Sequence, residues 1–198
     1  MNRHTFVLAA ALVATSVPGA FAQSLNDVRS LFDAGQYQQA MSTGGASQDP
    51  RVIFVVAQSH QKLRQTDEAR GVYERLAGRP DAWGAIGRSA VAVLSSNAAG
   101  AVQEADQAVA SGGSIAEAFY QRGLALSAKG DVGEAASAFQ KATELDPNWA
   151  SAHYYAGIAY SKAKRADLTA DHFQTFMRLA PQAPEKGEVQ SILRTLGR

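Results

Sequence analysis

The sequence of 198 residues contains no cysteine and has almost no net charge. Without cysteine the chain can form no disulfide, no thiolate metal site and no thiol-linked lipid anchor. Lys and Arg number 19 and Asp and Glu 18, which gives a formal net charge of +1. A balance of this kind creates no strong field that would attract nucleic acid or an acidic lipid surface. We therefore expect neither of these as a partner.

Long hydrophobic runs are also scarce, and the clearest one stands close to the N-terminus. Arg3 precedes an apolar run over residues 5–17, which is shorter than the roughly 18 residues of a membrane-spanning helix. A Pro-Gly pair follows, and Ala20-Phe21-Ala22 has the pattern that signal peptidase cleaves. We interpret residues 1–22 as a secretory signal peptide cleaved after Ala22. An uncleaved anchor or a buried first helix is the less favoured interpretation.

Cleavage at this site predicts an exported protein without a membrane span. The remaining chain would lack disulfides in an oxidising compartment, and the periplasm of a Gram-negative bacterium fits best.

Sequence patterns of catalysis are missing as well. The chain has no G-x-S-x-G, no H-E-x-x-H and no P-loop pattern. A metal site needs three or four ligands, and no cysteine or paired carboxylate accompanies the histidines. We therefore expect no enzymatic activity, no cofactor and no metal. A metal-dependent enzyme that uses His153 and His172 is the weakest alternative.

Residues 116–147 contain two amphipathic helical patterns separated by a Gly-Asp turn. Phe119, Gly123 and Leu126 fall on one face of the first helix, because they are spaced by four and three residues. Phe139 lies on the second helix, which we expect to stop before Pro147, since proline lacks an N–H group and restricts the preceding residue. The sequence therefore predicts a helical hairpin.

The same pattern recurs 34 residues later, where Gly157 and Phe173 take the places of Gly123 and Phe139. A fixed period of this length is typical of stacked helical hairpins, each of which buries its apolar face only against its neighbours. Glycine at this position would let the first helix of a hairpin approach the second closely, where a larger side chain would clash.

These residues resemble the tetratricopeptide repeat, whose pattern is W-x2-L-G-x2-Y, then A-x3-F, then P. The two copies supply Phe119, Arg122, Gly123, Leu126, Ala135, Phe139 and Pro147, and His153, Ala156, Gly157, Tyr160, Thr169, Phe173 and Pro181. The resemblance implies an all-α fold, a right-handed superhelix of about five stacked hairpins. The expected units are residues 24–48, 50–80, 81–113, 115–148 and 149–183, followed by a C-terminal capping helix over 184–198. The second helix of the first unit should fail near Gly44-Gly45.

The resemblance also implies a concave groove that is lined by the first helix of each hairpin and binds peptide segments. The groove-facing candidates are Phe54, Gln58 and Lys62 in the second unit, Tyr120, Leu124 and Ser127 in the fourth, and Tyr154, Ile158 and Lys162 in the fifth. Phe54, Tyr120 and Tyr154 would form a row of aromatic contacts, a residue type that is enriched at binding hot spots. Equally, these rings could simply cover neighbouring helices.

We therefore predict a periplasmic adaptor or scaffold that holds a protein or peptide segment within an envelope assembly. The alternative is an accessory subunit that binds glycan in polysaccharide export or cell-wall synthesis. Stacked aromatic rings serve both ligands, but a glycan also needs polar groups beside them. The polar candidates are Gln58, Gln61, Lys62 and Gln121.

Overall fold

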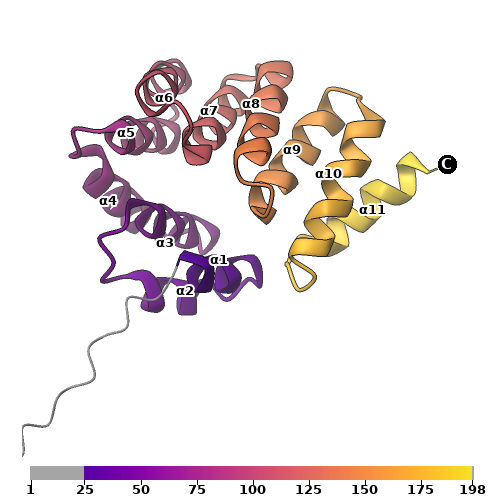
Figure 1. The fold of residues 1–198 in the computed structure, drawn as a ribbon, viewed down its shortest axis with the longest axis horizontal. Coiled ribbons are helices and arrows are strands. Elements are labelled where there is room, and N and C mark those ends of the chain that lie inside the picture. Colours follow the sequence, from indigo (N-terminus) through magenta and orange to yellow (C-terminus); the bar gives the residue numbers. More distant parts are fainter. Residues whose placement is uncertain (1–24, 198) are drawn as a thin grey trace, which may run out of the picture.

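The computed structural model describes residues 25–197, and the regular structure in this range consists of helices alone. The helices are α1 (Leu25–Asp33), α2 (Tyr37–Gly44), α3 (Pro50–Lys62), α4 (Thr66–Ala77), α5 (Ala82–Leu94), α6 (Ala98–Gly112), α7 (Ala116–Lys129), α8 (Val132–Leu145), α9 (Ala150–Lys162), α10 (Ala166–Leu179) and α11 (Lys186–Leu196). Consecutive helices pair and stack (Figure 1), which confirms the predicted fold class. The proposed signal peptide, residues 1–22, lies outside the described residues.

Local sequence signals explain where several of these helices begin and end. The Asp49 carboxylate caps α3 by accepting the N–H of Arg51, and Pro50 occupies the first turn, where no N–H is needed. Asp81 caps α5 in the same way. At the end of α7, Gly130 has a φ of +95°, a left-handed conformation that glycine adopts without a steric penalty.

Glycine–phenylalanine contacts hold the two regular hairpins together. A Cβ atom at Gly123 would lie 2.6 Å from Cε1 of Phe139, and one at Gly157 would lie 2.5 Å from Cδ1 of Phe173. Both rings are buried. The first helix can therefore approach the second only because it presents a backbone without a side chain at this point.

The first hairpin is shorter than the others, with nine residues in α1 and eight in α2. A Cβ atom at Gly44 would lie 2.8 Å from methyl groups of both Val52 and Val56 on α3. Gly44 thus lets α2 lie close to α3, and α2 ends there after eight residues, where the sequence places the Gly44-Gly45 pair.

The stack curves so strongly that its first helix meets its last units (Figure 1). Arg29 of α1 forms ion pairs with Glu117 at the start of α7 (2.7 Å) and with Asp146 after α8 (2.5 Å). Asp33, at the end of α1, accepts a hydrogen bond from Ser151 of α9 (3.3 Å). These contacts join residues 88 to 118 positions apart, so the superhelix closes on itself.

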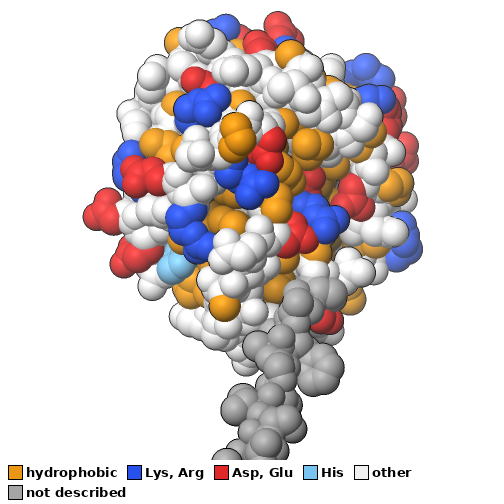
Figure 2. Space-filling model, turned by 60° about the vertical axis from the view of Figure 1, so that its left-hand side comes forward, with side chains coloured by type: hydrophobic (Ala, Val, Ile, Leu, Met, Phe, Trp, Pro, Cys, Tyr) orange, Lys and Arg blue, Asp and Glu red, His pale blue; other side chains and the backbone are white. Residues whose placement is uncertain are grey.

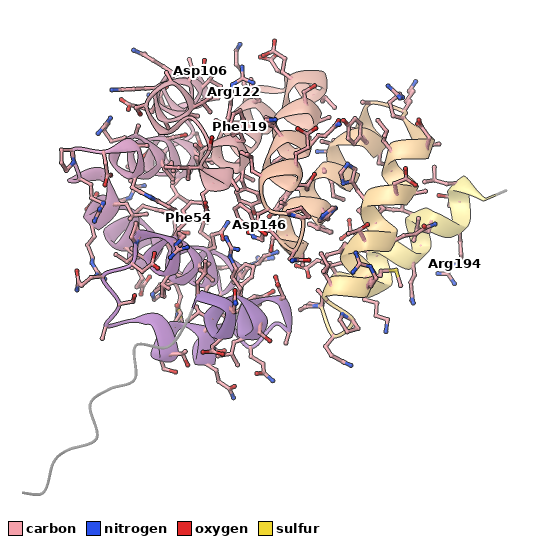
Figure 3. The ribbon with its side chains drawn as sticks, viewed as in Figure 1. Phe54, Asp106, Phe119, Arg122, Asp146 and Arg194 are labelled. Carbon is pink, nitrogen blue, oxygen red and sulfur yellow. The ribbon has the colours of Figure 1, made fainter. Side chains whose placement is uncertain are left out.

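Aromatic rings fill the interior of this closed stack, and we call them the axial aromatic cluster: Phe54, Trp83, Tyr120, Trp149 and Tyr155. Tyr120 is central, since its ring centroid lies 4.4 Å from that of Trp149, 5.6 Å from that of Tyr155 and 6.1 Å from that of Phe54. Figure 3 shows Phe54 on α3 at the inner side of the ring of helices and Asp146 at the end of α8 near α1. First helices on opposite sides of the axis therefore touch.

Candidate functional site

Every first helix contributes to one pocket beside the axial aromatic cluster, with a volume of about 220 Å³. We call it the axial pocket. It is lined by Phe32 of α1, Gln58, Gln61 and Lys62 of α3, Val93 of α5, Tyr120 and Leu124 of α7, and Tyr155 of α9. Helices from the first to the fifth unit meet here because the superhelix is tightly wound. The pocket combines apolar walls with two amide groups and one ammonium group.

Four of the predicted groove residues line the axial pocket: Gln58, Lys62, Tyr120 and Leu124. The structure nevertheless corrects the expectation of an open aromatic row. Phe54 is 0% exposed and Tyr120 is 1% exposed, and the amide of Gln58 donates to the Tyr120 hydroxyl (3.1 Å) across the axis. These two rings belong to the interior, because closure brings side chains of opposite first helices into contact.

The candidates of the fifth unit lie elsewhere. Tyr154 and Ile158 are half-buried against the apolar cluster of α10 and α11, and the Tyr154 hydroxyl donates to Glu188 (3.1 Å). Ser127 and Lys162 are exposed and do not line the axial pocket. Tyr155, the next residue after the predicted one, faces the axis instead.

Lys62 gives the axial pocket its charge. Its ammonium group lies 2.6 Å from a Glu185 carboxylate oxygen and about 6 Å from the ring centroids of Tyr154 and Tyr155. Burial disfavours the charged form, but Tyr155 and Glu185 outweigh this effect, so the pKa of Lys62 is raised. Lys62 therefore stays protonated and joins the second unit to the segment before α11.

A more open pocket of about 590 Å³ lies between α1 and the loops after α8 and α10. Arg29, Arg51 and Asp146 line it together with Asp33. Burial raises the pKa of Asp33 to about 6, although the Ser151 hydrogen bond and the Arg29 charge act in the opposite direction. On the face shown in Figure 2, basic and acidic side chains are interspersed among hydrophobic ones. Such a mixed surface favours a partner that offers both charges and apolar groups.

His153 and His172 come together, with their Nδ1 atoms 3.1 Å apart. The Nε2–H group of His153 donates to the Pro147 carbonyl (3.1 Å), so its Nδ1 accepts from His172. Burial and the neighbouring His153 lower the pKa of His172 to about 4. Among the described residues, no three His, Asp or Glu side chains are grouped in a way that could hold a metal ion. The pair acts as a packing contact between α9 and α10.

Gln121, a polar candidate from the sequence, is buried between helices and donates to the Ser89 hydroxyl (3.1 Å). Conversely, sequence reasoning missed Phe32, Val93 and Tyr155, which line the axial pocket. The 34-residue period reports which residues share a helix face. It carries no signal for how far the stack curves, and curvature decides which faces meet across the axis.

The stacked helix pairs, the interior lined by first helices and the terminal α11 form an α-solenoid whose fold is similar to that of tetratricopeptide repeat arrays. Residues 116–149 match the family model described as tetratricopeptide repeat. No curated protein sequence matches the chain.

Several solved structures are similar in fold. A thermophilic tetratricopeptide repeat protein of Thermus thermophilus is 18% identical, with a TM-score of 0.60 over 87% of this chain and 96% of that chain. The tetratricopeptide repeat domain of Arabidopsis OM64 is 20% identical, with a TM-score of 0.54 over 58% and 94%. MamA of Desulfovibrio magneticus is 22% identical, with a TM-score of 0.49 over 78% and 91%. In the part of the chain that the structure describes, none of the helices has the length and apolar character needed to cross a membrane.

Proposed function

We propose that this protein is an exported periplasmic adaptor that holds a protein or peptide segment of an envelope assembly at the axial pocket. The observation that carries the proposal is the convergence of all five first helices on that one pocket. A surface to which every unit contributes is the place where a solenoid recognises a ligand with its whole length. The export pattern of residues 1–22 supports the compartment.

The lining of the axial pocket indicates what kind of segment it suits. A volume of about 220 Å³ is smaller than a drug-sized cavity, which makes it suitable for one large side chain rather than a whole helix. Phe32, Val93 and Leu124 offer apolar contact. The Gln61 carbonyl oxygen accepts from the Tyr73 hydroxyl (2.6 Å), and the NH2 of the same amide can donate to a peptide group. A partner would therefore anchor one aromatic or aliphatic side chain in the pocket and bind along the rim with its main chain.

Site-specific photo-crosslinking in intact cells tests this proposal. A photoreactive residue at Leu124, which is half-buried in the pocket wall, should give a discrete protein adduct that mass spectrometry identifies. The same residue at the exposed Lys141 of α8 is the control and should give none. Adducts with glycan alone would shift the function to the polysaccharide alternative, and equal adducts at both positions would contradict a specific pocket.

A further inference from the structure

The first unit closes over the axial pocket by touching the last unit. We call the contact surface the closure interface: Phe32, Asp33 and Tyr37 of the first unit meet Ser151, Tyr155 and Ala183 of the last. The space left among these side chains is only about 10 Å³, so they fit closely here, although the pocket of about 590 Å³ separates α1 from the loops after α8 and α10. A Cβ atom at Gly35 would lie 2.6 Å from Cγ of Pro184, which shows the same tight approach.

We propose that the closure interface is a latch that controls access to the axial pocket, and that a partner segment enters when the first and last units separate. This inference rests on the proposed function, because it concerns the regulation of the same pocket. The separated state would expose Phe32 and Tyr155, which contribute both to the closure interface and to the pocket. The closed structure is then the resting form of the adaptor.

Ion pairs accompany the aromatic and apolar contacts of the closure interface. Arg29 binds Glu117 and Asp146 and places its guanidinium 4.7 Å from the ring centroid of Trp149. Lys62 binds Glu185 on the far side of the stack. When an ion pair of this kind separates, hydration of the two charges compensates for the lost attraction. Exposed apolar side chains gain no such compensation. The closure interface is therefore suited to reversible opening.

Opening need not disrupt any hairpin. The first unit remains anchored on α3 through a separate apolar cluster that includes Val28, Val52 and Val56. The last unit is held by its own cluster, which includes Phe173, Phe176 and Val189. Because each unit of a solenoid contacts its neighbours through such clusters, small changes spread along the stack can separate the two ends.

Distance measurement between spin labels tests the latch directly, since the chain has no cysteine to interfere. Labels at Gln38→Cys on α2 and Gln174→Cys on α10 occupy exposed positions in the first and last units. Glu185→Lys places a like charge opposite Lys62 and should raise the ratio of open to closed molecules roughly fivefold. A longer distance should therefore appear beside the wild-type distance.

Two variants control this measurement. Combining Lys62→Glu with Glu185→Lys restores an opposite-charge pair and should return the distribution toward wild type. Glu144→Lys makes the same charge change at an exposed site on α8 and should leave the distribution unaltered. A Glu185→Lys distribution identical to that of wild type would overturn the latch.

Crosslinking from Leu124 separates this inference from the proposed function. If the latch controls access, Glu185→Lys should increase the yield of the identified partner adduct over wild type, while Glu144→Lys should not. Equal yields in all three chains would overturn the latch and leave the adaptor function standing. Absence of any protein adduct, even in the chain whose label distances show opening, would overturn the proposed function instead.

Discussion

At the residue scale, a glycine and a phenylalanine facing each other set the separation of the two helices in each regular hairpin. The Phe139 ring occupies the space beside Gly123, and Phe173 does the same beside Gly157. A glycine inside a helix normally lowers stability relative to alanine, because it increases the entropy of the unfolded chain. Here the cost is offset by the burial of a whole aromatic ring against the bare backbone.

The substitution Gly123→Ala should therefore destabilise the protein. The added methyl group overlaps the buried ring of Phe139, and overpacking of this kind costs about 1–3 kcal/mol of unfolding free energy. Gly133→Ala is the matched control, because a Cβ atom there meets no atom within 4 Å and should stabilise α8 by about 0.5–1 kcal/mol. Urea unfolding followed by circular dichroism measures both. A urea midpoint of Gly123→Ala equal to that of wild type would show that the Phe139 ring moves aside without cost.

At the element scale, the pattern of apolar residues identified the terminal helix but could not show how well it is covered. α11 packs Val189 fully out of solvent against the cluster formed by Ala150, Phe173 and Phe176. Ile192 and Leu193 on the same face are partly buried. The helix thus covers an apolar face of the last hairpin that would otherwise lie in water, the usual role of a capping element in a repeat array.

Val189→Asp should detach this helix. Burying an unpaired carboxylate, or exposing the cluster beneath it, should cost about 2–4 kcal/mol and lower the melting temperature. Gln190→Asp adds the same group at the neighbouring exposed position and should have little effect. Differential scanning calorimetry compares the two variants. A melting temperature for Val189→Asp equal to that of the control would mean that α11 contributes nothing to the stability of the last unit.

At the scale of the whole molecule, closure connects the fold to the protonation of Asp33. Burial raises the pKa of Asp33 to about 6 from its ordinary 3.8, so the closed form binds a proton more tightly than an open form with the ordinary pKa. Closure is therefore favoured by acid and weakens as the pH rises through about 6. The groups that act on Asp33 besides burial are Ser151, Arg29, Glu185 and Lys62, with Tyr37 nearby.

The spin-labelled chain should thus close further when the pH falls from 7.5 to 5, with a roughly tenfold smaller ratio of open to closed molecules. Asp33→Asn carries no titrating group at this position and should remove most of that change. His172 is neutral in the folded chain because its pKa is lowered, so the chain loses stability as the pH falls below the ordinary pKa of histidine. The pair of His153 and His172 lies within one hairpin, however, and should not alter the label distance. If Asp33→Asn leaves the pH response unchanged, another titrating group causes the pH dependence of closure.

The sequence by itself determined the helices, their pairing and the glycine–phenylalanine contacts, because these depend on residues within about 34 positions of one another. Helical periodicity also shows which face of a first helix points away from the second helix of its hairpin. The sequence therefore indicated Gln58, Lys62 and Leu124, which line the axial pocket. Only the tertiary structure decided that Phe54 and Tyr120 are buried and that Tyr155 faces the pocket. These outcomes depend on the curvature summed over five units, which brings Arg29 to Asp146. A small rotation at each interface is invisible in a local pattern, yet its sum determines whether the groove is open or closed.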